Sequence, residues 1–152
     1  MRRYLLHLMS VIALMVGVTG CVENEQPQPE KFELEQCWGL KSFCGTPVDA
    51  DILIDFEEGG EFTIYQRTQE SKYIVFTGTY EADEANSLLT GEYSDGTSWS
   101  RSYNYTVDKV ARELALVSVE MADEVSVYEP AKLPADDVIA TRSAWVSDVK
   151  PL

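Results

Sequence analysis

Residues 51–67 read DILIDFEEGGEFTIYQR, two alternating runs on either side of a glycine-bearing turn. Every second position belongs to one face: Ile52, Ile54 and Phe56 in the first run, and Phe62, Ile64 and Gln66 in the second. Because successive side chains of a strand point to opposite faces, this alternation predicts two strands with one buried face. Gly59 and Gly60 supply the positive φ that a tight connection needs, so the stretch predicts a β-hairpin.

The same pattern continues along the chain, with turn residues about every 8 to 12 positions. The predicted strands are residues 36–43, 50–57, 61–68, 73–81, 87–93, 98–107, 113–119 and 124–129. Such short links leave no room for crossover helices, so neighbouring strands pair antiparallel. We therefore predict an all-β fold, an eight-stranded antiparallel up-and-down barrel, which removes exposed sheet edges. Asp136 and Asp137 before an apolar triplet predict a short C-terminal helix, followed by buried Trp145 and Val146.

The first residues are typical of an export signal. Arg2 and Arg3 precede an apolar run at residues 4–18, and Val18-Thr19-Gly20-Cys21 follows. This ending resembles the lipobox of bacterial lipoproteins, which implies that Cys21 receives lipid and becomes the new N-terminus. The predicted organisation is a signal peptide at 1–20, a lipidated cysteine with a disordered tether at 21–34, and a barrel domain at 35–152. An ordinary secretory signal with an incidental cysteine is the alternative.

Composition excludes several functions for the exported chain. His7 is the only histidine and lies in the predicted signal peptide. The mature chain thus has no Ser-His-Asp triad, no Cys-His pair and no histidine metal ligand. Its 10 basic residues stand against 26 acidic ones, because Arg2 and Arg3 leave with the signal. A net charge of −16 argues against nucleic acid as a partner. No acidic cluster has the form of a calcium loop, and no carboxylate pair is selected for hydrolysis, so we expect no metal, no cofactor and no enzymatic activity.

Several short motifs occur together in a recognisable order. They are Trp38-Gly39-Leu40-Lys41-Ser42-Phe43, Phe62 to Arg67, Gly78-Thr79-Tyr80, Gly91 to Gly96, Trp99, Tyr103 and Leu133-Pro134. In this order they resemble the lipocalin-like domain of small Bacteroidetes lipoproteins. The resemblance implies a calycin-type barrel closed by a tryptophan in its first strand. Lipocalins carry G-x-W at that point, whereas this chain has Gln36-Cys37-Trp38.

The predicted interior is rich in rings, several of which carry hydroxyl groups that need partners. The candidate ligand-binding residues are Arg101, Tyr103, Tyr105, Tyr80, Tyr93 and Gln66. Arg101 and Tyr103 lie two residues apart, so on one strand they share a face and form a clamp for a small anion. This pair is similar to the R-x-Y pair of fatty-acid-binding barrels. The alternative for Arg101 is a structural ion pair with an acidic residue or a place at the rim.

Two functions follow from these observations. The first is a lipid-anchored, exported protein that binds a small, largely apolar ligand in the barrel mouth. It would sit in the cell envelope, on the outer membrane, at the periplasmic face or the cell surface. The second is a solid barrel that acts as a protein-interaction or envelope-assembly subunit, with Phe43, Tyr65 and Val75 gathered in one exposed patch.

The two cysteines left after lipidation of Cys21 are Cys37 and Cys44. Export into an oxidising compartment favours a disulfide between them. However, if residues 37–44 form one extended strand, the Cα atoms are roughly 23 Å apart, too far for a bridge. We therefore expect two unpaired, mostly buried thiols.

Overall fold

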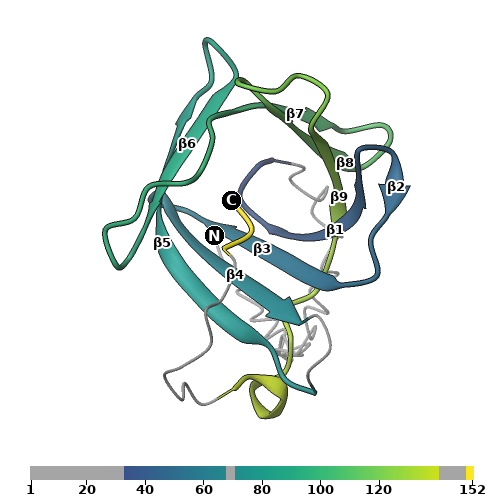
Figure 1. Ribbon diagram of the computed structural model, residues 1–152, viewed down its shortest axis with the longest axis vertical. Coiled ribbons are helices and arrows are strands. Elements are labelled where there is room, and N and C mark those ends of the chain that lie inside the picture. The colour runs from purple at the N-terminus through teal and green to yellow at the C-terminus, as the bar shows by residue number, and fades with distance from the viewer. Residues whose placement is uncertain (1–32, 68–70, 141–149) are drawn as a thin grey trace, which may run out of the picture. The chain divides into compact units, whose positions relative to one another are not determined.

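A closed ring of antiparallel strands is the main feature of the computed structural model, which describes residues 33–67, 71–140 and 150–152 (Figure 1). These residues belong to one unit, Lys31–Leu152. Nine strands occur in the described ranges: β1 Cys37–Phe43, β2 Thr46–Pro47, β3 Asp51–Glu57, β4 Glu61–Arg67, β5 Ile74–Asp83, β6 Leu88–Tyr93, β7 Tyr103–Asp108, β8 Glu113–Ser118 and β9 Val125–Pro130. All except β2 form the ring.

The ring is closed by hydrogen bonding between the first and last strands. β1 pairs antiparallel with β9 from Trp38 opposite Pro130 to Phe43 opposite Ser126, with a register shift between Leu40 and Ser42. Every other strand of the ring pairs with its neighbour in sequence. Closure satisfies the backbone groups that two free edges would expose. The predicted eight-stranded antiparallel barrel is confirmed.

Cross-strand register gathers the predicted apolar face inside the barrel. Ile54 lies opposite Ile64, which lies opposite Phe76 on β5. Six interior side chains have no accessible surface, and we call them the packed belt: Trp38, Ile54, Ile64, Leu89, Leu114 and Leu116. The alternation of residues therefore predicted the inward face correctly.

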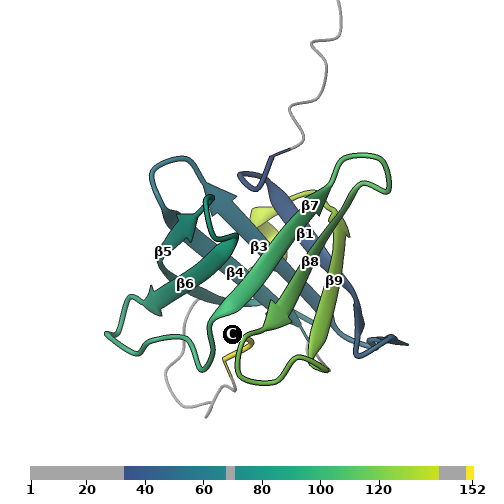
Figure 2. The ribbon, with the colours of Figure 1, turned by 90° about the horizontal axis from the view of Figure 1, so that it is seen from above.

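The two ends of the barrel differ, and we name them by the direction of β1. The base is the end where β1 begins. There Leu34 is buried, and the indole Nε1 of Trp38 donates a hydrogen bond to the Leu34 backbone oxygen at 2.9 Å. The sequence placed Leu34 in a tether, but it belongs to the core. The mouth is the opposite end, where β4, β6 and β8 also finish (Figure 2).

Three local predictions are corrected. The strand predicted at 98–107 begins only at Tyr103, because residues 99–102 leave the ladder after a single bridge between Ser98 and Glu92. The two-residue strand β2 was missed. The predicted helix is one 3₁₀ turn, Asp136–Val138.

Some predictions fall on residues that the structure does not describe. They concern the signal peptide, Cys21, most of the tether, and the expected burial of Trp145 and Val146. Within the described ranges, no helix has the length and apolar character needed to cross a bilayer.

Both cysteines of the barrel are free thiols in different surroundings. Cys37 is buried, whereas Cys44 is exposed just beyond the end of β1, so the expectation of burial is wrong for Cys44. Burial, together with the nearby charge of Asp55, raises the pKa of the Cys37 thiol to about 12. Because the thiolate is the reactive form, Cys37 should resist alkylation.

We expect a chain carrying Cys21→Ser to take up one iodoacetamide at pH 8 without reductant, and a second only after unfolding. Intact-mass spectrometry measures both steps. Adding Cys44→Ser should abolish the first. No mass increase in the unreduced, unfolded chain would instead indicate a disulfide.

Candidate functional site

The indole ring of Trp99 occupies the interior between β6 and β7, where the ladder consists of only two residue pairs. The Trp99 backbone N–H donates to the Gly91 carbonyl at 2.9 Å, which holds the loop against β6. A Cβ atom at Gly91 would overlap the indole of Trp99. Glycine at position 91 therefore makes the space that the ring fills.

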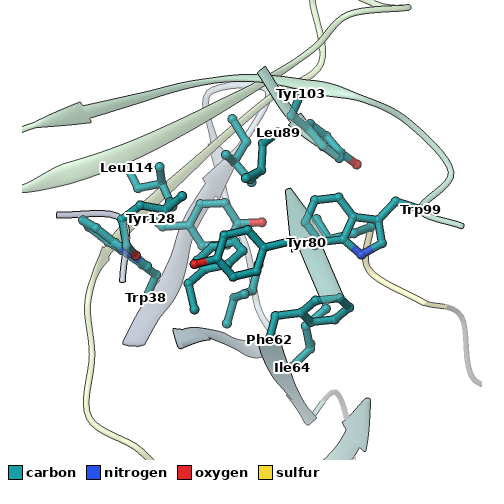
Figure 3. Close-up of a cluster of buried hydrophobic side chains, with 14 of the residues drawn as sticks. Trp38, Phe62, Ile64, Tyr80, Leu89, Trp99, Tyr103, Leu114 and Tyr128 are labelled. Carbon is teal, nitrogen blue, oxygen red and sulfur yellow. The ribbon is translucent and has the colours of Figure 1, made fainter. Parts of the chain in front are cut away.

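Trp99 joins a set of rings that meet edge to face. Its ring centroid lies 5.2 Å from that of Phe62 and 6.1 Å from that of Tyr103. Tyr93 in turn lies 5.5 Å from Phe62 and 6.1 Å from Phe76. Figure 3 shows Phe62, Tyr80, Trp99 and Tyr103 around the shared interior. Rings in this arrangement provide a broad apolar surface with a few polar atoms.

The indole nitrogen of Trp99 is the polar atom without a partner in this set. Trp99 is only 6 % exposed, and its Nε1 is buried with no hydrogen bond among the described residues. A buried N–H without an acceptor costs about 1–3 kcal/mol. The Trp99 N–H can therefore donate a hydrogen bond to an acceptor on a bound molecule.

The structure divides the predicted tyrosines into two groups. Burial raises the pKa of Tyr93 to about 12, and the nearby Tyr103 contributes to this rise. Tyr80 and Tyr105 interact instead with each other and with Glu35, which precedes β1 at the base. The four predicted tyrosines thus share one core cluster, but their hydroxyl groups have different surroundings.

The two base-side tyrosines differ in their contacts. The hydroxyl of Tyr80 donates to the Glu57 backbone oxygen at 3.1 Å, in the turn between β3 and β4. Burial raises the pKa of Tyr80 to about 12. Tyr105 lies opposite Leu116 of the packed belt and is half-buried. The unpartnered Trp99 Nε1, whose ring contacts that of Tyr103, is what favours the mouth as the candidate site.

Arg101 forms an ion pair at the mouth. Its Nε lies 2.7 Å from Glu124 Oε2, and its Nη2 donates to Glu124 Oε1 at 3.0 Å. Both side chains are partly exposed, so the pair stabilises the fold by about 0–1 kcal/mol. It joins the loop before β7 to the loop before β9. The guanidinium charge is therefore compensated, and an anionic ligand would have to compete with Glu124.

Gln66 lies near the mouth end of β4, opposite Ile52 and Ile74, and is half-buried. The structure thus brings four predicted residues to the mouth side of the barrel: Gln66, Tyr93, Arg101 and Tyr103. Their role in binding stays a prediction.

Sequence reasoning missed Tyr128 and Leu152. Tyr128 on β9 is buried opposite Leu114, and burial raises the pKa of its hydroxyl well above the ordinary value. The alternation of Ser126 and Tyr128 with valines was the available signal. Leu152 is buried in the core cluster, where its backbone contacts the Tyr93 hydroxyl. No local sequence pattern predicts the contact between Leu152 and Tyr93.

A concavity lies on the outer wall over β4, β5 and β6. Its volume is about 410 Å³, and its lining includes Glu57, Glu61, Glu92 and three threonines. In the described part of the chain, no three histidine, cysteine or acidic side chains converge as metal ligands. Solvated carboxylates and hydroxyls of this kind give the wall its acidic character.

No protein-family model matches this sequence, and no curated protein is detectably similar to it. The lipocalin-like resemblance therefore stays a prediction beyond the barrel architecture itself.

Substituting Gly91 tests how the site is built. We expect Gly91→Ala to lower the free energy of unfolding by about 1–3 kcal/mol, because the new methyl group displaces the Trp99 indole from a packed interior. Urea denaturation followed by circular dichroism measures the change.

Gly39→Ala is the matched control. The added Cβ there meets the Ala131 Cβ at 3.2 Å and the flexible Leu53 side chain at 3.3 Å, so the loss should be smaller. An equal loss of unfolding free energy in both variants would contradict a specific effect of the close contact between Gly91 and Trp99.

Proposed function

We propose that this chain is a lipid-anchored, exported barrel of the lipocalin-like kind that binds a small, largely apolar molecule at its mouth, without enzymatic activity. The observation that carries the proposal is the buried Trp99 Nε1, which has no acceptor among the described residues, in a ring-lined interior. Ligand sites combine such apolar walls with a few directed polar groups.

The charges at the mouth favour a neutral ligand. Arg101 is engaged by Glu124, and the chain as a whole is strongly acidic. A free carboxylate on the ligand would meet both the competing Glu124 and a negative field. An uncharged molecule with one hydrogen bond acceptor fits Trp99 Nε1 without either penalty.

The proposed location rests on the first 21 residues. The arginines, the apolar run and Val18-Thr19-Gly20-Cys21 support export and lipidation at Cys21. Buried acyl chains contribute about 0.8 kcal/mol for each CH₂ group, which is enough to support attachment to a membrane, and we propose the outer membrane of the cell envelope.

The alternative function is a solid barrel that acts through its outer surface. The packed belt favours it, because six interior side chains leave no accessible surface. Phe43 is exposed, but the strands that carry Phe43, Tyr65 and Val75 are not all neighbours, so the predicted patch is not contiguous. Tyr65 and Val75 are cross-strand partners on β4 and β5, whereas Phe43 lies on β1, two strands from β4. Phe43, Val119 and Met121 are instead exposed at the mouth end.

A ligand panel separates the two functions. We expect the neutral probe N-phenyl-1-naphthylamine and neutral lipids to bind saturably and raise the melting temperature, while glycans do not. Trp99→Phe removes the indole N–H and should weaken binding of acceptor-bearing ligands about two- to tenfold, as the loss of one neutral hydrogen bond predicts. Fluorescence titration measures these affinities.

Tyr65→Phe is the control, because Tyr65 lies on the outer face of β4 and should leave affinity unchanged. An absence of saturable binding by every apolar compound in the panel would reject the ligand-binding function and leave the solid-barrel alternative.

Anchoring has a separate test. We expect the chain expressed in a Gram-negative bacterium to sediment with membranes, and Cys21→Ser to move most of it to the soluble or unprocessed fraction, because the lipid acceptor is lost. Cell fractionation with immunoblotting measures the shift, and Cys44→Ser should not change it. Membrane association that survives Cys21→Ser would contradict lipidation at this residue.

A further inference from the structure

The last described residues of the chain lie inside the barrel mouth. Lys150, Pro151 and Leu152 are far in sequence from every strand, yet Leu152 is 4 % exposed and belongs to the core cluster. Figure 1 shows this short segment within the ring of strands, and Figure 2 places it toward the mouth end. The segment therefore occupies the same region as the proposed ligand site.

One hydroxyl group recognises the backbone of Leu152. The Leu152 N–H donates to Tyr93 Oη at 3.1 Å, and Tyr93 Oη donates to the Leu152 backbone oxygen at 3.2 Å. A hydroxyl group has one donor and two acceptor sites, so it can serve both groups. Buried backbone groups need such partners. The contact thus recognises one backbone N–H and one backbone oxygen next to an apolar side chain.

Lys150 holds the segment at the rim. Its Nζ lies 4.5 Å from the centroid of the Tyr93 ring and 2.6 Å from Asp95 Oδ2. Hydrogen bonding from Lys150 is the main reason that the pKa of Asp95 falls to about 2. Asp95 is largely exposed, so this ion pair is weakened by solvent and salt.

The contacts that retain the segment are few and reversible. Among the described residues they consist of one buried leucine, two hydrogen bonds to a single hydroxyl group, the approach of the Lys150 ammonium to the Tyr93 ring and one rim ion pair. The segment adds no strand to the ring, so its departure leaves the barrel's backbone pairing intact. A segment with these properties can leave the mouth without unfolding the protein.

We propose that residues 150–152 are an internal occupant of the ligand site, which an incoming molecule displaces by taking over the contacts to Tyr93. This inference rests on the proposed ligand binding. The displacing molecule is a neutral apolar compound that carries a secondary amide, such as an acylated amino acid amide or an apolar peptide. Its amide replaces the backbone of Leu152, and its apolar part replaces the leucine side chain.

Release of the segment also changes the charge at the mouth. Asp95 loses its lysine partner when Lys150 leaves, so the open mouth is more negative than the occupied one. The acidic rim then disfavours anionic ligands, in agreement with the neutral class inferred from Arg101 and Glu124.

The test uses N-octanoyl-leucinamide as the probe and the full chain labelled with ¹⁵N-leucine. In the wild type, we expect the Leu152 amide to be protected from hydrogen exchange and to lose this protection as the probe saturates the protein. Leu152→Asp should expel the segment and tighten probe binding at least threefold by calorimetry. Lys150→Ala should tighten it less, because only the rim contact is lost.

Leu133→Asp is the matched control, because Leu133 is exposed in the segment after β9 and should leave the affinity unchanged. Binding of the probe with an unchanged Leu152 signal would overturn this inference alone. An absence of binding in both the wild type and Leu152→Asp would overturn the proposed function as well. Binding only in Leu152→Asp would support a tightly held occupant.

Discussion

The pairing of β1 with β9 is the constraint on which the other features depend. Those two strands are the first and last of the ring, so their hydrogen bonds convert a meander with two edges into a barrel. Only in the closed form do the alternate side chains of all eight strands face one interior. Trp38 on β1 then becomes fully buried, and its indole N–H reaches back to Leu34 at the base. Without closure, the aromatic side chains of the inward face would be exposed to water on one side of an open sheet.

Closure also makes the two ends chemically different. At the base, Tyr80 has its hydroxyl engaged by the β3–β4 turn, and Leu34 covers the first strand. At the mouth, Tyr93 contacts a distant part of the chain and Arg101 is paired across two loops. The chain enters the barrel at the base through Leu34, which leaves the loops of the mouth at the opposite end for recognition. Loops on a rigid scaffold are where binding groups usually occur.

Trp99 links the architecture to the candidate site. The ladder between β6 and β7 is short, and the freed residues 98–102 pass over Gly91, which lets the indole enter the interior. The same departure from the ladder removes Arg101 from the inward face and places it where Glu124 can neutralise it. The anion clamp inferred from alternation therefore depended on a strand that begins five residues later than expected, at Tyr103. A neutral ligand suits the resulting charges better than an anion does.

Local alternation and glycine-bearing turns were enough to predict the barrel, the inward rows and seven of the eight strands of the ring to within two residues. These features can be predicted from the sequence because strand period and turn conformation depend on neighbouring residues. The side-chain contacts at the mouth could not be predicted in this way. The burial of Leu34 and Leu152, the pairing of Arg101, and the different hydroxyl partners of Tyr93 and Tyr80 arise from contacts between segments far apart in sequence. These contacts depend on strand tilt, register and closure. A local pattern can predict that a tyrosine side chain points inward. Only the closed barrel determines its position along the barrel axis and its hydrogen-bond partner.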